Sequence, residues 1–193
     1  MTFDERAPII IADARPLIRL AAAGLLESLR GLNRRIVLVD RVVDEVVGDA
    51  SKPFAGEVAA WIVRMGEAIE RARTVEGYGI EALRQDAASD EAKALLKRRL
   101  RDSGERAIRE FIEGLEPDEA GVAIVVYEDR DAPALMAAAR VPLTLMTTRR
   151  FARLVNEWGV KVDAVAALEA IADRYDLKPS ANMEIEPAGP TGK

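Results

Sequence analysis

Carboxylates follow the short apolar runs of this 193-residue chain, or lie one helical turn beyond them. Asp13, Asp40 and the cluster from Glu128 to Asp131 each come directly after such a run, and Glu45 and Glu105 lie at or near the starts of predicted helices. Carboxylates held close together repel one another unless a proton or a cation compensates. Oxygen ligands of this kind favour hard divalent cations such as Mg²⁺ or Mn²⁺.

Two residue types are missing, and their absence narrows the chemistry. The chain has no cysteine and no histidine, which excludes disulfides, thiolate zinc sites, cysteine nucleophiles, Ser-His-Asp triads and imidazole acid–base catalysis. A divalent cation held by carboxylates can lower the pKa of a water molecule and neutralise charge on a phosphate. The composition therefore suits phosphodiester hydrolysis.

The elements that must position these acids alternate along the chain. Residues 8–12, 36–39 and 121–127 are apolar runs that predict buried strands, and a helical apolar spacing follows the first run from about residue 16 to 30. Nearly continuous apolar strands alternating with helices indicate an α/β fold with a mostly parallel sheet covered on both faces. Ligands bind beyond the carboxyl ends of such strands, so most of the acids should meet at one edge.

The remaining chain is expected to complete one domain over residues 1–177. Residues 178–193 are rich in Pro, Ala, Gly and Ser and predict a disordered tail. The further predicted elements are helices at 40–48 and 53–66, a strand at 69–75, one or two exposed helices in 77–102, a helix from 103, a short helix to 140, a strand at 141–146 and two helices ending near 175.

Charge and hydropathy bear on where the protein acts. No apolar run approaches the roughly 20 residues of a membrane span, and the charged start of the chain is not typical of a secretory signal. These features predict a cytoplasmic protein without a membrane partner. The formal net charge of −5 argues against nucleic-acid binding by bulk charge, although a local basic patch remains compatible with it.

Four segments resemble the acidic motifs of the PIN-domain family, and a fifth resembles the segment after that family's last strand. The acids occur in the family's order and at its separations, and the resemblance covers roughly residues 8 to 172. The segments are Ile10-Ile11-Ala12-Asp13-Ala14-Arg15-Pro16-Leu17-Ile18, Val42-Val43-Asp44-Glu45-Val46, Ser103-Gly104-Glu105-Arg106-Ala107-Ile108, Val125-Val126-Tyr127-Glu128-Asp129-Arg130-Asp131, and Thr147 through Gly159.

The resemblance implies a three-layer α/β/α sandwich that acts as a metal-dependent endoribonuclease, with Mg²⁺ or Mn²⁺ as cofactor and RNA as substrate. Many members are VapC-like toxins held inactive by a small antitoxin protein, and many form homodimers. By motif position, the catalytic metal ligands would be Asp13, Glu45, Glu105 and Asp129, with Glu128 and Asp131 as further candidate ligands. The candidate phosphate-binding residues are Arg15, Arg149 and Arg150, together with Arg153.

Two positions depart from the family pattern. Arg15 stands where Ser, Thr or Asn is usual, and Tyr127 stands where the family has a hydroxyl residue two positions before the fourth acid. A guanidinium at position 15 could compete with the metal or bind the substrate phosphate. The alternative function is therefore a catalytically weakened PIN-fold module that binds RNA or a protein partner.

Simpler interpretations of the same residues remain open. Asp13 and Asp40 could cap the helices that follow them, and the helix dipole alone favours Glu105 in a first turn. Asp44 and Glu45 flank the same apolar helix face, so periodicity does not choose between them. The basic run Lys97-Arg98-Arg99 with Arg101 predicts a solvated helix face first and an RNA-backbone contact second.

Overall fold

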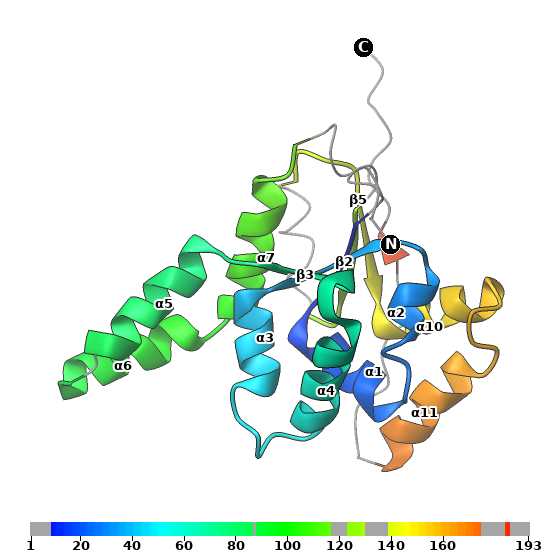
Figure 1. The fold of residues 1–193 in the computed structure, drawn as a ribbon, viewed down its shortest axis with the longest axis horizontal. Coiled ribbons are helices and arrows are strands. Elements are labelled where there is room, and N and C mark those ends of the chain that lie inside the picture. The colour runs from blue at the N-terminus through cyan, green and yellow to red at the C-terminus, as the bar shows by residue number, and fades with distance from the viewer. Residues whose placement is uncertain (1–8, 87, 117–122, 130–138, 175–183, 186–193) are drawn as a thin grey trace.

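The computed structural model describes residues 9–86, 88–116, 123–129, 139–174 and 184–185 (Figure 1). Their centre is a six-stranded sheet in the order β3-β2-β1-β4-β5-β6, in which neighbouring strands are parallel except for the last pair. The mostly parallel α/β sandwich predicted from the sequence is confirmed. The strands are β1 (Ile9–Ala12), β2 (Arg35–Val39), β3 (Ile69–Ala72), β4 (Ala123–Tyr127), β5 (Leu143–Thr147) and β6 (Glu184–Ile185).

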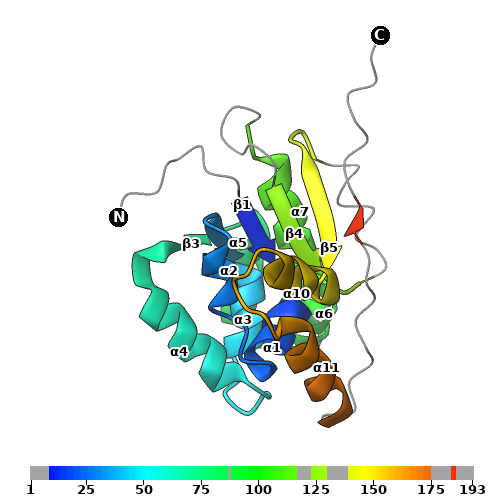
Figure 2. The same ribbon diagram turned by 90° about the vertical axis from the view of Figure 1, so that its right-hand side faces the viewer.

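Helices cover both faces of this sheet. The chain steps from β1 to β2 to β3 in one direction and then returns past β1 to β4, so right-handed crossovers place the two sets of helices on opposite faces. Helices α1 (Ala14–Ala22), α4 (Ala55–Met65), α10 (Thr148–Glu157) and α11 (Ala164–Arg174) pack around one another (Figure 2). Helix α7 (Ser103–Glu113) contacts β2, and α3 (Asp40–Val47) packs against both α1 and α7.

The core follows from the apolar strands. All residues of β1 and β4 are buried, as both faces of these strands are covered by helices. Asp13 is the first residue after β1, and its N–H donates to the carbonyl of Val126 in β4 at 3.0 Å. The buried ladder therefore extends to the residue that the sequence singled out for chemistry.

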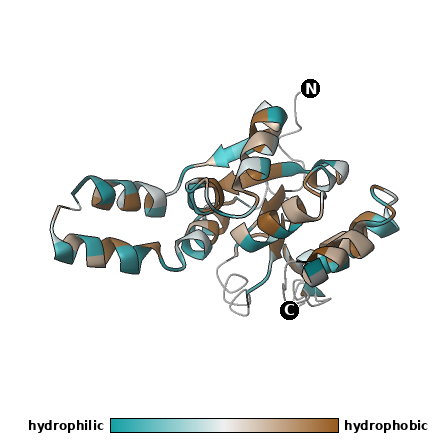
Figure 3. Ribbon diagram, turned by 90° about the horizontal axis from the view of Figure 1, so that it is seen from below, coloured by the Kyte–Doolittle hydropathy of each residue, from teal (hydrophilic) through white to brown (hydrophobic). Residues whose placement is uncertain are grey.

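A helical arm projects from the body. Helices α5 (Val75–Asp86) and α6 (Asp90–Leu100) lie side by side and extend away from the sheet (Figure 1), and hydrophilic and hydrophobic residues are interspersed along them (Figure 3). None of the residues of α6 is buried. The prediction of exposed helices between residues 77 and 102 is confirmed.

The structure differs from the sequence-based expectation at two places. The helix expected over residues 16–30 is divided into α1 and α2 (Ser28–Gly31), because the chain turns at Gly24 with a φ of +66°. Two residues of the expected disordered tail, Glu184 and Ile185, instead pair with Met146 and Leu145 as β6.

Some expectations cannot be compared with the fold. The short helix ending at residue 140 and Asp131 fall largely or wholly outside the described ranges, as does the rest of the segment 178–193. Among the described helices, none has the length and apolar character needed to cross a membrane.

Candidate metal site

The four acids named by motif position come from four elements at the carboxyl edge of the sheet. Asp13 follows β1 and Asp129 lies two residues beyond β4, and these two strands are neighbours. In the strand order, the step from β1 to β2 and the step from β4 to β5 run in opposite directions across the sheet, which makes the crevice between β1 and β4 a typical ligand position. Glu45 lies in α3, and Glu105 lies in the first turn of α7.

All four side chains line one open pocket with a volume of about 670 Å³. Among the described residues, seven carboxylates and five basic side chains line it, which gives these residues a formal net charge of −2. The negative charges of these acids exceed the positive charges of the basic side chains by two, which one divalent cation would balance. The acids are Asp13, Asp44, Glu45, Asp49, Asp102, Glu105 and Asp129, and the bases are Arg15, Arg41, Lys52, Arg84 and Arg101.

Gly104 makes room for two of these carboxylates. A Cβ at this position would lie 3.2 Å from Oε2 of Glu45 and 3.6 Å from Oδ1 of Asp13. The first turn of α7 therefore passes close beneath two oxygens that come from separate elements. A glycine permits this approach without displacing either carboxylate, which gives a physical reason for the Gly-Glu pair in the sequence motif.

Asp13 is held in an environment that disfavours its charge. The pKa of its carboxyl is raised from 3.8 to about 6, chiefly by burial and also by the negative charges of Glu45 and Asp129, against the opposing effects of the Ala14 N–H and Arg15. Although Asp13 occupies the N-cap position of α1, its side chain makes no capping hydrogen bond. Capping therefore does not account for this residue.

The acids surround a common space without already forming a coordination shell. Within the described ranges, no three acidic side chains come close enough to one another to hold an ion as they stand. Mutual repulsion keeps ionised carboxylates apart when no cation lies between them. The donor set nevertheless fits Mg²⁺ or Mn²⁺, because it consists of hard carboxylate oxygens, carries a net negative charge and leaves Asp13 poorly neutralised.

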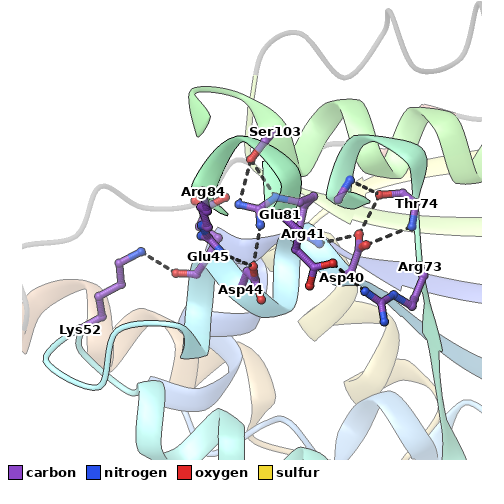
Figure 4. Close-up of polar contacts among 11 residues, drawn as sticks. Asp40, Arg41, Asp44, Glu45, Lys52, Arg73, Thr74, Glu81, Arg84 and Ser103 are labelled. Atoms are coloured by element: carbon purple, nitrogen blue, oxygen red, sulfur yellow. Dashed lines mark hydrogen bonds and ion pairs between the residues drawn. The ribbon is translucent and has the colours of Figure 1, made fainter. Parts of the chain in front are cut away.

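The structure distinguishes Asp44 from Glu45 as candidate metal ligands, a choice that helical periodicity left open. Asp44 Oδ2 accepts from Arg41 at 2.6 Å and from Arg84 of the arm at 3.0 Å (Figure 4). Its charge is therefore already matched by two guanidinium groups. Glu45 lies beside Gly104 and Asp13, so the geometry favours Glu45 as the ligand, in agreement with the motif.

Arg15 also lies in the pocket. Its guanidinium is 3.4 Å from Oδ2 of Asp129, and both side chains are substantially exposed, at 66% and 43%. An exposed pair of this kind contributes little to stability, typically less than about 1 kcal/mol. The guanidinium of Arg15 takes the place that a metal ion would need beside Asp129, one of the candidate ligands.

Other residues predicted for the site lie elsewhere. Glu128 accepts from the backbone N–H of Thr148 at the start of α10, and neither residue lines the acidic pocket. Arg149 pairs with Glu169 at 2.5 Å, and Arg150 pairs with Glu157 and Glu184. These two arginines join α10 to α11 and β6, and the pocket brings neither of them to the acids.

Tyr127 and Asp40 have structural surroundings. Tyr127 is 3% exposed, burial raises the pKa of its phenol, and its hydroxyl has no hydrogen-bond partner among the described residues. Its ring is part of the hydrophobic core. Asp40 accepts hydrogen bonds from the backbone and hydroxyl of Thr74, at 3.0 and 2.7 Å, and thereby fixes the start of α5 (Figure 4).

Sequence reasoning missed the residue that joins the acidic helices. The Arg41 side chain is buried, and its guanidinium contacts Asp44 and, at 3.4 Å, the hydroxyl of Ser103 (Figure 4). It connects α3 to the start of α7 and so sets Glu45 against Gly104. Its one visible signal is an arginine on the apolar side of a helix, where a charge needs a partner.

The comparisons with known proteins do not extend this picture, because no protein-family model, no curated protein and no solved structure matches the chain. The resemblance to PIN domains therefore remains a prediction that rests on the sequence motifs.

Proposed function

We propose that this chain is a PIN-type, Mg²⁺- or Mn²⁺-dependent endoribonuclease that hydrolyses phosphodiester bonds of RNA. The observation that carries the proposal is the close approach of the Asp13 and Glu45 carboxylates to Gly104, in one pocket with Glu105 and Asp129. The raised pKa of Asp13 supports it, since burial of this carboxyl outweighs the opposing effects of the Ala14 N–H and Arg15, and acids perturbed in this way cluster at functional sites.

The residues divide into two roles. Asp13, Glu45, Glu105 and Asp129 would hold the ion, which when bound supplies an activated water and positive charge for the phosphate. Arg41 orients this set by tying α3 to α7, and the carboxylates orient the nucleophile without forming a covalent bond to the substrate. The mechanism requires no protein nucleophile, which agrees with a chain that has neither cysteine nor histidine.

Cleavage of a labelled RNA by the wild type, by Asp13→Asn and by Asp49→Asn tests this function. Asp49 lines the same pocket but binds Ser51 on an exposed loop, so its variant removes the same charge outside the proposed ligand set. We expect Asp13→Asn to lose cleavage by a factor on the order of 10³, comparable to losing one catalytic electrostatic group. Asp49→Asn should keep it. Undiminished cleavage by pure Asp13→Asn would contradict the proposal.

The family resemblance extends the proposal to the protein's partners. We propose a cytoplasmic toxin of a toxin–antitoxin pair, held by a small antitoxin protein and able to form a homodimer. A short neighbouring reading frame whose product binds the chain and suppresses cleavage would be the expected companion. Purification of the chain with no such partner and no effect on cell growth would count against the toxin role.

A second candidate function is a PIN-fold module that binds RNA or a protein partner without cleaving. The contact of Arg15 with Asp129 favours it, because the guanidinium occupies a position where a metal would need the carboxylate. Arg15→Ser separates the two candidates. A gain of metal binding or cleavage indicates a site weakened by Arg15, whereas equal or lower activity makes Arg15 part of a working enzyme.

A further inference from the structure

The corner between α6 and α7, residues 99–103, is held in place by hydrogen bonds from the side chain of Arg106. Asp102 adopts a left-handed backbone conformation, with a φ of +54°. Arg106 donates to the carbonyl of Arg101 at 2.9 Å and also to the carbonyl of Arg99. The same guanidinium pairs with Glu76, a carboxylate that is 8% exposed, at 2.7 Å. The backbone that carries Arg101 is therefore held in one position at the rim of the acidic pocket.

The side chain of Arg101 differs from the other cations of the pocket. Arg15 pairs with Asp129, Arg41 and Arg84 pair with Asp44, and Lys52 donates to the carbonyl of Glu45 at 2.5 Å. Among the basic side chains that line the pocket in the described part of the chain, Arg101 alone makes no hydrogen bond or ion pair. The fold fixes its main chain and leaves its guanidinium uncommitted.

The guanidinium of Arg101, which has no partner among the described residues, lies beside seven carboxylates and can bind a phosphate of a polyanionic substrate. The pocket's net negative charge repels a phosphate, and the other four cations are already engaged by the protein. A planar guanidinium can bind a phosphate through two parallel hydrogen bonds. Arg101 and the acids line the same pocket, so one strand lying across it can meet both.

We propose that Arg101 binds a backbone phosphate of a single-stranded RNA lying across the acidic pocket, and so determines where the strand sits relative to the four acids. This rests on the proposed function for its substrate class. It assigns the phosphate contact to the corner between the arm and α7, whereas the sequence motif pointed to Arg149 and Arg150, which are paired within the body.

The test is the salt dependence of RNA binding. A short fluorescein-labelled single-stranded RNA is titrated by fluorescence anisotropy, in EDTA and in Mn²⁺, over a series of KCl concentrations. The proteins are the wild type, Arg101→Ala, Arg101→Lys and Arg98→Ala. Arg98 is the matched control, because it is an exposed arginine at the end of α6 that does not line the pocket.

We expect Arg101→Ala to weaken binding on the order of tenfold, and to lower the slope of log K against log salt by about 0.7, the value for one phosphate contact on a single strand. Arg101→Lys should restore the slope but only part of the affinity, since it keeps the charge and loses the planar fork. If Arg101→Ala acted through a folding defect, its melting temperature would fall below that of the wild type, and Arg101→Lys would not restore binding. Arg98→Ala should bind like the wild type.

Two results would overturn the inference. Equal affinity and equal slope for Arg101→Ala and the wild type would remove Arg101 from the interface, while the cleavage test on Asp13 would still decide the proposed function by itself. No binding of single-stranded RNA by the wild type in either buffer would also overturn it. Conversely, an Arg101-dependent slope in a protein that does not cleave would keep the inference and refute the nuclease.

Discussion

Two acidic residues of this molecule, Glu76 and Asp13, have carboxylates in contrasting surroundings. Glu76, at the base of the arm, is 8% exposed and is matched by Arg99 at 3.0 Å and Arg106 at 2.7 Å. Asp13, at the end of β1, has the acidic neighbours Glu45 and Asp129, and the guanidinium of Arg15 pairs with Asp129.

The difference teaches how structural and functional acids can be distinguished in a fold. A buried carboxylate that only holds elements together is supplied with partners by the chain, because an unmatched buried charge destabilises the folded state. For Asp13, burial and two neighbouring acids outweigh the compensation from the Ala14 N–H and Arg15, and the raised pKa of its carboxyl is the consequence. An acid in this condition is a candidate for an external cation.

The largest expected effect is on stability, from removing the charge of the matched acid, Glu76. Glu76→Gln leaves Arg99 and Arg106 without their anion and loosens the corner that carries Arg101. Loss of one partner of a buried pair costs 3–5 kcal/mol, and partial exposure of both arginines reduces this to about 2 kcal/mol. Urea unfolding measures the loss. Unchanged stability would show that Glu76 does not brace the arm.

The contribution of the unmatched acid to folding stability should fall as the pH rises. The folded-state pKa of Asp13, about 6, lies above its ordinary value of 3.8. Its contribution therefore favours folding below pH 3.8 and is lost as the pH rises through 6. Because Asp13 keeps some contact with solvent, we expect about 2 kcal/mol of lost stability in EDTA, less than the full linkage value.

Asp13→Asn isolates this contribution. In EDTA the variant should be more stable than the wild type at pH 7 and similar to it near pH 4, since the titrations of all other groups cancel in the difference. Unfolding free energies measured by urea at both pH values check this. A variant that is less stable than the wild type at pH 7 would mean that the charge of Asp13 is compensated.

A smaller effect is expected at Gly104, the glycine beside the two carboxylates. Gly104→Ala places a Cβ 3.2 Å from Glu45 Oε2, so the carboxylate must move by a few tenths of an ångström. We expect Mn²⁺ affinity, measured by titration calorimetry, to fall about tenfold, while helix propensity adds up to about 1 kcal/mol of stability. Gly56→Ala in α4, where a Cβ meets open space, is the control. Equal affinities would separate Gly104 from the metal site.

The sequence was sufficient for the sheet and for the order of the acids. β1 and β4 are continuous apolar runs, and each is followed within two residues by an acid, so the parallel arrangement and its carboxyl edge could be predicted. The choice between Asp44 and Glu45 could not, because it depends on Arg84, which lies 40 residues away along the chain.

The same limit explains the arginines. Arg149 and Arg150 are placed by motif near the last strand, but Glu169 and Glu184, 20 and 34 residues further on, engage them. Arg101 was only one charge in a basic run until the fold braced its backbone and left its side chain beside the acids. Long-range pairing, which no local pattern encodes, decides which charges remain for a ligand.

The central claim is that the unmatched carboxylates await a divalent ion, and thermal unfolding with Mn²⁺ or EDTA tests it most directly. The proteins are the wild type, Asp13→Asn and Asp49→Asn. Ion binding at a hundredfold excess over Kd stabilises a folded protein by about 2.7 kcal/mol. We predict that Mn²⁺ raises the melting temperature of the wild type and of Asp49→Asn but not of Asp13→Asn, and so offsets or reverses the stability gap seen in EDTA. An equal rise in all three proteins, or none in the wild type, would contradict the account.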